Sequence, residues 1–220
     1  MLSQTEKSYG SSYERKGTYW DEYYSRSMDV SRPFPSQFAT FVAGELERAH
    51  RVVEFGCGNG RDSLFFSSIG HQVVGVDASA PAVEHCTRLA ASLGDRSVFL
   101  AAGIDDPALP GLVPDVAGPT AIYARFFLHA ITELEEEAFL RCAAELTMPG
   151  DIMAVEYRTV RDQAQQKVTD SHYRRFISPP SFQLAAARFG FVVRYAVEGF
   201  GFAKYREDDA YVARSILVRE

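Results

Sequence analysis

Two acidic residues and a glycine-rich segment have the types and spacing of a ligand-binding site. Glu54 lies near the end of the apolar run at residues 51–55. Three glycines follow at every second position, Gly56, Gly58 and Gly60. A second apolar run, residues 71–76, ends before Asp77. Because glycine has no Cβ, such a loop turns tightly and lets a ligand lie against its backbone, where the carboxylates would accept hydrogen bonds from hydroxyl or ammonium groups.

The position of the third glycine distinguishes between two nucleotide ligands. A dinucleotide-binding loop has its third glycine one residue later, where a pyrophosphate meets the helix N-terminus, but Arg61 occupies that position here. This departure argues against NAD. A nucleoside with a positively charged amino acid end would instead place that end against the loop and its ribose hydroxyls against Asp77. S-adenosylmethionine has this shape.

The combination of Glu-x-Gly-x-Gly-x-Gly with Asp77 resembles the class I S-adenosylmethionine-dependent methyltransferases over residues 45–155, with looser similarity in the flanks. The resemblance implies an enzyme that uses S-adenosylmethionine as its cofactor and methylates an O or N atom of a small-molecule acceptor. It further implies that Glu54 orients the loop and the cofactor's ammonium, that the glycines admit its methionine and ribose, and that Asp77 binds both ribose hydroxyls. Ala78 or Ser79 would border the adenine. In the other reading, Asp77 only caps the following helix.

Apolar segments of strand length alternate with amphipathic helical patterns from Arg51 onward. This alternation predicts an α/β, Rossmann-like fold with a mostly parallel sheet and helices on both faces. The predicted strands are residues 51–55, 72–76, 97–101, 121–124, 151–156, 191–197 and 211–218, seven in all, of which the last two would pair as an antiparallel hairpin. The predicted helices are residues 62–68, 81–93 and 133–147, and an earlier helical pattern ends near Ala49. Residues 107–119 are rich in proline and glycine and predict a loop.

Length and composition predict a single domain over residues 1–220. The chain has 220 residues and 46% hydrophobic content, enough for one substantial core. Residues 1–44 would form an N-terminal cap, residues 45–220 the cofactor-binding core, and residues 158–180 an insertion that shapes the acceptor site. The cap is aromatic around Tyr24, which is assigned to the acceptor site. In similar enzymes such a segment closes over the cofactor; in the other reading its aromatic residues only hold a terminal helix against the core.

Charge and cysteine content exclude several classes of protein. The net charge is -6 at pH 7, so the chain lacks the basic surface that neutralises phosphates, and nucleic acid is not an expected partner. No apolar run has the length of a membrane span, and no charged-then-apolar leader begins the chain, so we expect a cytoplasmic protein that does not bind membranes. Three scattered cysteines fit neither a disulfide framework nor a zinc site.

The third predicted strand is followed by residues that suit an adenine ring. Ile104 would lie against the ring, and Asp105 would accept its amino hydrogens. A turn before Pro107 explains the same residues equally well. Both readings stay open at this point.

Residues after the fourth and fifth strands are candidates for catalysis, because open parallel sheets bind ligands beyond the carboxyl ends of their strands. Arg125 and His129 follow the fourth strand, and Arg125 is assigned to the cofactor site. His129 is a candidate general base, since an imidazole titrates near neutrality and would take a proton from a hydroxyl or amine. In the other reading, His129 only hydrogen-bonds a neighbouring loop. No Asn/Asp-Pro-Pro-Tyr motif follows this strand, which argues against methylation of DNA or of protein glutamine.

The segment after the fifth strand combines a base, a phenol and guanidinium groups. Its candidate acceptor-binding residues are Glu156, Arg158, Tyr173, Arg174 and Arg175, and His172 is a second candidate catalytic base. Because guanidinium forks suit carboxylates and phosphates, these residues predict an acceptor with an anionic group, such as an acid, a sugar acid or a phosphorylated metabolite. In the other reading, the arginines pair with Glu156, Asp162 and Asp170 to hold a lid in place.

Methyl transfer from a sulfonium is an in-line displacement that needs the nucleophile, carbon and sulfur in line and water excluded. We therefore expect positioning to dominate, without a metal. The aromatic loop at residues 199–205 would gate the pocket or serve as a surface connection. Two functions from other classes stay open. They are a NAD(P)-linked oxidoreductase and a non-catalytic module that binds S-adenosylmethionine without turnover.

Overall fold

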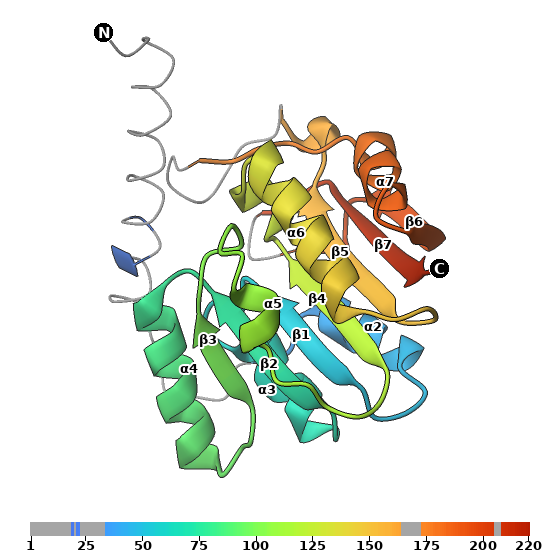
Figure 1. Cartoon of the computed structure of the whole chain (residues 1–220). Coiled ribbons are helices and arrows are strands. Elements are labelled where there is room, and N and C mark those ends of the chain that lie inside the picture. Colours follow the sequence, from blue (N-terminus) through green and yellow to red (C-terminus); the bar gives the residue numbers. More distant parts are fainter. Residues whose placement is uncertain (1–18, 20, 23–33, 164–172, 205–207) are drawn as a thin grey trace, which may run out of the picture.

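The computed structural model describes residues 19, 21–22, 34–163, 173–204 and 208–220. These residues form one seven-stranded sheet in the order β3-β2-β1-β4-β5-β7-β6 (Figure 1). The strands are β1 (Arg51–Phe55), β2 (Gln72–Asp77), β3 (Val98–Ala101), β4 (Thr120–Arg125), β5 (Ile152–Arg158), β6 (Phe191–Gly199) and β7 (Val212–Arg219). Neighbours run parallel from β3 to β5, whereas β7 is antiparallel to both β5 and β6. The predicted fold class is confirmed, including the antiparallel C-terminal hairpin.

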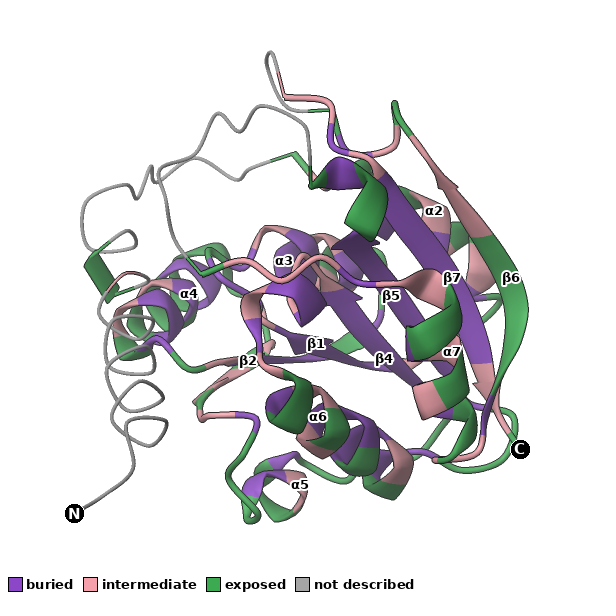
Figure 2. Cartoon of the chain, turned by 90° about the horizontal axis from the view of Figure 1, so that it is seen from above, coloured by how far each residue is buried: buried purple, intermediate pink, exposed green. Residues whose placement is uncertain are grey.

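Helices cover both faces of the sheet (Figure 2). They are α2 (Gln37–Glu45), α3 (Arg61–Ser68), α4 (Ala80–Leu93), α5 (Leu109–Leu112), α6 (Glu133–Leu146) and α7 (Pro179–Ala187), with the short 3-10 helices η1 (Leu128–Ala130) and η2 (Val160–Asp162). On the face of α5, α6 and α7, Phe139 packs edge-on against Phe55 of β1. On the face of α2 and α3, Phe38 and Phe66 pack against Tyr123 of β4. Burial on both faces explains why the central strands are largely apolar rather than alternating in polarity.

Two helices begin and end at local signals in the sequence. The Thr132 side chain accepts the Glu135 N–H while the Glu135 carboxylate accepts the Thr132 N–H, a capping box that starts α6. Ser79 caps α4, Pro81 fits its first turn, and Gly94 ends it in a left-handed conformation. Both helices lie where the sequence predicts them.

Two segments differ from the predictions. α2 ends before Ala49, because Leu46 leaves the helix and packs into the core cluster on the face of the sheet covered by α2 and α3. Residues 107–119, expected as a loop, contain the short helix α5. Pro110 is tolerated there because the first turn of a helix needs no backbone donor, and Leu109 is fully buried. In both cases tertiary burial of one leucine decides the local structure.

The parallel strands bring the candidate residues to one edge of the sheet. Phe55 of β1 is in register with Val76 of β2 and Ala124 of β4. Arg125 of β4 is in register with Glu156 of β5. The segments that follow these strands therefore leave from the same edge, which is where open parallel sheets bind ligands.

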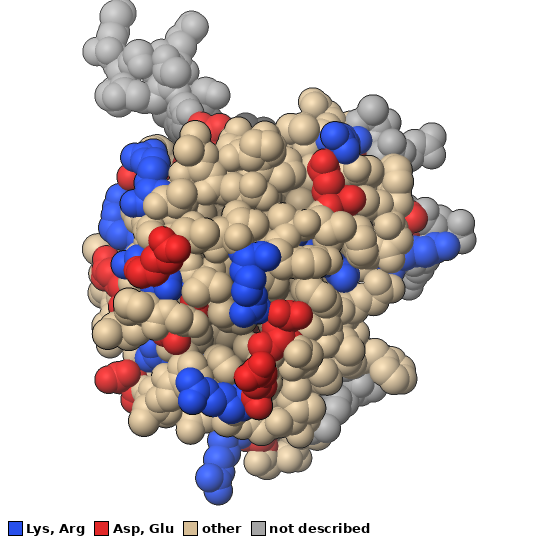
Figure 3. Space-filling view, turned by 90° about the vertical axis from the view of Figure 1, so that its right-hand side faces the viewer, with Lys and Arg blue, Asp and Glu red and all other residues tan. Residues whose placement is uncertain are grey.

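β6 is the outermost strand of the sheet on the side away from β3, and Figure 3 views the molecule from the β6 side. Basic and acidic side chains are interspersed on the face in view. Arg194 of β6 pairs with Glu45 of α2 at 2.7 Å, and Arg161 pairs with Glu198 at 3.0 Å. Such exposed pairs neutralise charge locally and contribute little to stability.

Candidate functional site

The glycine loop between β1 and α3 turns through left-handed backbone conformations. Gly56 and Gly60 have φ angles of 71° and 72°. A Cβ at Gly56 would lie 2.8 Å from Cδ2 of Phe127, and one at Gly60 would lie 2.8 Å from Sγ of Cys86. The protein itself therefore excludes side chains at both positions.

Asp77 ends β2 beside the glycine loop. Its Oδ2 accepts the Gly58 N–H at 2.9 Å, and its Oδ1 accepts the Ser79 N–H at 2.9 Å. Burial raises the pKa of Asp77, and the backbone donors partly offset this. Ser79 supplies the side-chain cap of α4, and its hydroxyl donates to Asp21 at 2.7 Å. Asp77 and the glycine loop thus form one hydrogen-bonded unit, and the ribose contact of Asp77 stays a prediction.

Glu54 is buried one residue before the end of β1. Its Oε2 accepts the hydroxyl hydrogen of Ser63 in α3. Burial raises the pKa of Glu54 well above its ordinary value, and the nearby Asp62 carboxylate raises it further. The environment of Glu54 therefore favours its protonated form until a cation approaches.

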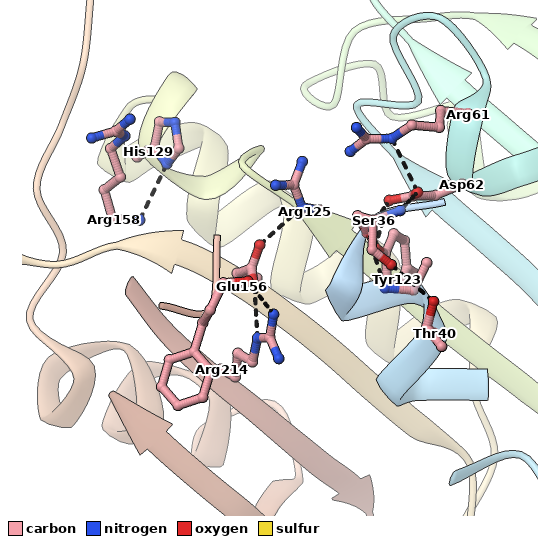
Figure 4. Close-up of polar contacts among 12 residues, drawn as sticks. Ser36, Thr40, Arg61, Asp62, Tyr123, Arg125, His129, Glu156, Arg158 and Arg214 are labelled. Carbon is pink, nitrogen blue, oxygen red and sulfur yellow. Dashed lines mark hydrogen bonds and ion pairs between the residues drawn. The ribbon is translucent and has the colours of Figure 1, made fainter. Parts of the chain in front are cut away.

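Asp62 is a buried carboxylate at the start of α3 that the sequence patterns do not single out. It accepts the Ser36 N–H at 2.8 Å, the Ser36 hydroxyl at 2.7 Å and the Tyr123 hydroxyl at 2.8 Å. These bonds tie the N-cap of α2 to α3 and β4 (Figure 4). An acid in the first helical turn after a glycine loop is the available sequence signal, but its partners lie 26 and 61 residues away.

The residues predicted beside the adenine lie after β2 and β3. Ala78 is exposed, whereas Ile104 is buried in the larger core cluster. Asp105 is exposed in a turn whose Asp106 N–H donates to the Gly103 carbonyl at 3.2 Å. This is the turn offered by the second reading of the sequence, and the adenine contacts stay predictions.

Arg125 of β4 and Glu156 of β5 form an ion pair inside the sheet edge. Nε of Arg125 donates to Oε1 of Glu156 at 2.9 Å, and Nε of Arg214 on β7 donates to Oε2 at 2.7 Å (Figure 4). Glu156 is fully buried, which raises its pKa, and the two guanidinium groups oppose that shift. Arg214 also donates to the Phe202 carbonyl at 2.6 Å. The arginines that hold Glu156 thus come from β4 and β7, not from the segment after β5.

Phe126, directly after β4, has a left-handed backbone conformation with φ of 57°. Its N–H donates to the Glu156 carbonyl at 2.8 Å. Its ring centroid lies 4.2 Å from Cζ of Arg125, and it packs in a small cluster with Ala203 and Val212. Such a conformation is strained for an aromatic residue and persists only where its contacts enforce it, often at functional sites. Nothing in the sequence signals it.

His129 lies in η1, and its ring centroid is 5.1 Å from that of Phe126. Its Nδ1 accepts the Arg158 N–H at 3.3 Å, and its carbonyl accepts the Arg175 N–H at 2.8 Å. With Nδ1 accepting a backbone hydrogen, the neutral ring carries its proton on Nε2 and presents that nitrogen as a donor. The contact with a neighbouring segment is therefore observed, and the role of general base stays a prediction.

Arg158 at the end of β5 and Arg175 in the following segment pair with carboxylates of the protein. Arg158 donates to Asp162 at 2.7 Å and also to Asp208. Arg175 donates to Glu136 of α6. These pairs match the reading in which arginines hold this segment in place, with Asp162 as an expected partner and Asp208 and Glu136 as further ones. Asp170 lies outside the described residues.

The remaining acceptor-site candidates are only partly described. Tyr173 is exposed and Arg174 is half-buried. Burial lowers the pKa of Arg174, and the positive charge of Arg158 lowers it further. Tyr24 and His172 lie outside the described residues. The acceptor roles of Tyr24, Tyr173 and Arg174 and the catalytic role of His172 stay predictions.

The described part of the chain contains no cluster of three or more His, Cys, Asp or Glu side chains that could hold a metal ion. The helices in that part of the chain are too short or too polar to cross a membrane. The predicted cytoplasmic location stays a prediction.

Comparisons with known proteins were made against families, curated proteins and solved structures. A family model described as a methyltransferase domain matches residues 24–196. No curated protein matched the chain.

Several solved structures share this fold. One, solved in work on the conversion of a disulfide bond into a thioacetal group during echinomycin biosynthesis, is 18% identical with a TM-score of 0.71, and the match covers 93% of each chain. The CcbJ methyltransferase from Streptomyces caelestis is 18% identical with a TM-score of 0.66, covering 94% of this chain and 98% of that one. A SAM-dependent methyltransferase from Methanosarcina mazei is 14% identical with a TM-score of 0.65, covering 81% and 96%. At these identities the similarity is one of fold.

Proposed function

The chain belongs to the methyltransferase domain family, within the class I S-adenosylmethionine-dependent methyltransferases, and from this membership we propose that it methylates an O or N atom of a small-molecule acceptor. Family membership confirms the predictions of an enzyme and of S-adenosylmethionine as its cofactor. We propose further that the acceptor carries an anionic group, as in an acid, a sugar acid or a phosphorylated metabolite.

One observation supports the cofactor-binding part of the proposal most strongly. The Gly58 N–H donates to Asp77 at 2.9 Å, which joins the glycine loop to the acid that follows β2. A nucleoside lying across this edge would donate its ribose hydroxyls to Asp77 and present its amino acid end to the loop and to Glu54. A dinucleotide would need its pyrophosphate at the position where Arg61 begins α3.

The residues of the chain would act mainly by positioning. S-adenosylmethionine supplies an electrophilic methyl group when bound. The Nε2–H of His129 would orient an oxygen or nitrogen of the acceptor, because its Nδ1 already accepts the Arg158 N–H. Removal of an acceptor proton by His129 would first require that hydrogen bond to break. His172 is the other proposed base.

The N-terminal segment would exclude water from the reaction. We propose that residues 1–44 act as a cap on a single domain, with residues 158–180 shaping the acceptor site. The hydrogen bond from Ser79 to Asp21 supports this, because it ties the N-terminal segment to the residues that follow Asp77. Excluding water matters because it strengthens electrostatic interactions and prevents hydrolysis.

Calorimetry with a panel of cofactors tests the proposal. We expect saturable binding of S-adenosylmethionine and S-adenosylhomocysteine, and no binding of NAD⁺ or NADP⁺. Binding of a dinucleotide in place of either adenosyl compound would establish the oxidoreductase reading instead.

Turnover separates an enzyme from a binding module on the same fold. We expect methyl groups from isotope-labelled S-adenosylmethionine to appear in at least one member of a panel of small acids, sugar acids and phosphorylated metabolites. A protein that binds the cofactor but transfers no label to neutral or anionic acceptors would be the non-catalytic module.

A further inference from the structure

The guanidinium of Arg125 is fixed on one side and open on the other. Its Nε donates to the buried Glu156 at 2.9 Å, and its Cζ lies 4.2 Å from the ring centroid of Phe126. Among the described residues, no atom accepts from its two terminal nitrogens, and the side chain is 18% exposed. Figure 4 shows these nitrogens pointing away from Glu156. The guanidinium fork of Arg125 is therefore held in one orientation, and its two terminal nitrogens are available as hydrogen-bond donors.

The charges around Glu156 do not cancel. Arg125 and Arg214 share this single carboxylate, so the group carries at least one excess positive charge whether Glu156 is ionised or not. In contrast to these two arginines with one carboxylate between them, Arg158 has two carboxylate partners and Arg175 has one. An uncompensated, partly buried cation attracts an anion more strongly than one that already has a protein partner.

The place of Arg125 along the sheet edge points to the acceptor. Asp77 ends β2 and the glycine loop follows β1, so under the proposed function the cofactor would lie over these two strands. β4 is the next strand in the sheet order, on the side away from β2. The ring of Phe126 contacts both Arg125 and His129, which brings the open fork close to the candidate catalytic residue.

We propose that Arg125 binds a carboxylate or phosphate group of the acceptor through its two terminal nitrogens. This inference rests on the proposed function and names a specificity-determining residue for it. Because Nε already donates to Glu156, the two terminal nitrogens remain as donors, and their spacing in the guanidinium plane matches two oxygens of a carboxylate or phosphate. Glu156 and Phe126 are then positioning residues, because they fix the orientation of the fork before the anion arrives.

Anion binding to the complex with S-adenosylhomocysteine tests the proposal. Benzoate and inorganic phosphate serve as separate probes, titrated into wild type, Arg125→Gln, Arg125→Lys and the exposed control Arg141→Gln. We expect at least one probe to bind wild type and the control equally and to bind Arg125→Gln at least tenfold more weakly. Arg125→Lys, which keeps the charge without the fork, should be intermediate. Urea unfolding of each variant verifies that it is folded.

Several outcomes would overturn the inference. One is the absence of saturable binding of both anions by wild type, and another is equal anion affinity for Arg125→Gln. The carboxylate of the cofactor itself is the competing source of an anion, and it corresponds to the cofactor-site role that the sequence predicts for Arg125, which stays a prediction. If Arg125→Gln weakened S-adenosylhomocysteine but not 5′-methylthioadenosine, which lacks the amino acid end, Arg125 would serve the cofactor instead.

Failure of the proposed function gives a different result. In that case wild type would not bind S-adenosylhomocysteine at all, and the same titrations on the unliganded protein would still decide whether Arg125 binds anions. If wild type binds S-adenosylhomocysteine but neither anion, or if Arg125→Gln binds the anions as wild type does, the result therefore counts against Arg125 alone.

Discussion

Glu54 and Asp77 are carboxyl groups at the same sheet edge, but their surroundings stabilise the ionised carboxylate to different extents. Asp77 accepts two backbone N–H groups, which stabilise its ionised form. Glu54 has a single hydroxyl donor, Ser63, and lies near the Asp62 carboxylate. Glu54 is therefore the group whose protonation responds to the arrival of a cationic ligand.

Glu54 should make the free protein less stable as the pH rises. Because its folded pKa is raised above the unfolded value, mainly by burial, the folded state binds more protons than the unfolded state between the two values. The contribution is fully present below the unfolded pKa and is lost as pH rises through the folded pKa. We expect Glu54→Gln to remove this decline, which begins in urea unfolding as the pH rises above the ordinary pKa of a glutamate. An unchanged slope in Glu54→Gln, compared with the exposed control Glu137→Gln, would contradict this.

His129 should act without accepting a proton in the reaction. Its Nδ1 accepts the Arg158 N–H at 3.3 Å, so the ring presents Nε2–H. We expect His129→Asn to retain the pH profile of kcat/KM and to lower kcat by less than about tenfold, because loss of a general base costs about 10²–10⁴-fold. The measurement is the rate of methyl transfer to the best acceptor of the panel. A loss above about a hundredfold, together with loss of an ionisation from the profile, would establish the general base.

At the scale of elements, the glycine loop is shaped by the helices packed behind it. Gly60 precedes α3, and a Cβ there would meet Sγ of Cys86 in α4 at 2.8 Å. Cys86 also donates to the Gly58 carbonyl at 3.2 Å. The loop therefore depends on α4 as well as on its own glycines, and the ligand edge is coupled to the packing of two helices.

Replacing Gly60 with alanine should destabilise the protein by more than its φ angle alone requires. A left-handed alanine costs about 1–2 kcal/mol, and the contact with Cys86 adds to that. Gly94→Ala is the matched control, because Gly94 has φ of 64° but a Cβ added there would have no described neighbour within 4 Å beyond the adjoining residues. We expect urea unfolding to rank Gly60→Ala below Gly94→Ala in stability, and Cys86→Ala to recover part of the difference. Equal costs at the two glycines would refute the steric explanation.

At the scale of the whole molecule, the sequence predicts the sheet well because apolar runs mark its strands directly. The residues from Arg51 to Phe55 form β1 as expected. Contacts across long separations are a different matter. Arg214 reaches Glu156 from 58 residues away, and no periodicity in either strand encodes that pair. The predicted position of the cofactor site follows from local spacing, whereas the observed partners of its residues follow from tertiary packing.

We predict that ligand binding and global stability are linked in this molecule, because Asp77, the proposed ribose ligand, also accepts the backbone hydrogen bonds that hold the loop. S-adenosylhomocysteine at a hundred times its Kd should stabilise wild type by about 2.7 kcal/mol. This should raise Tm by about 5–10 °C for a chain of this length. Asp77→Asn should weaken binding by about 1.5–3 kcal/mol, the range for hydrogen bonds to charged groups.

The same concentration of S-adenosylhomocysteine should then raise the Tm of Asp77→Asn by less than half the wild-type shift. Asp106→Asn is the control, because Asp106 is an exposed turn residue that accepts the Ala108 N–H at 2.9 Å and lies after β3 rather than β2. It should keep the full shift, since its carboxylate belongs to a local turn. The assay is thermal unfolding with and without ligand. Equal shifts in wild type and Asp77→Asn would mean that the ribose lies elsewhere, because a carboxylate that binds two hydroxyls cannot be made neutral without a loss of affinity.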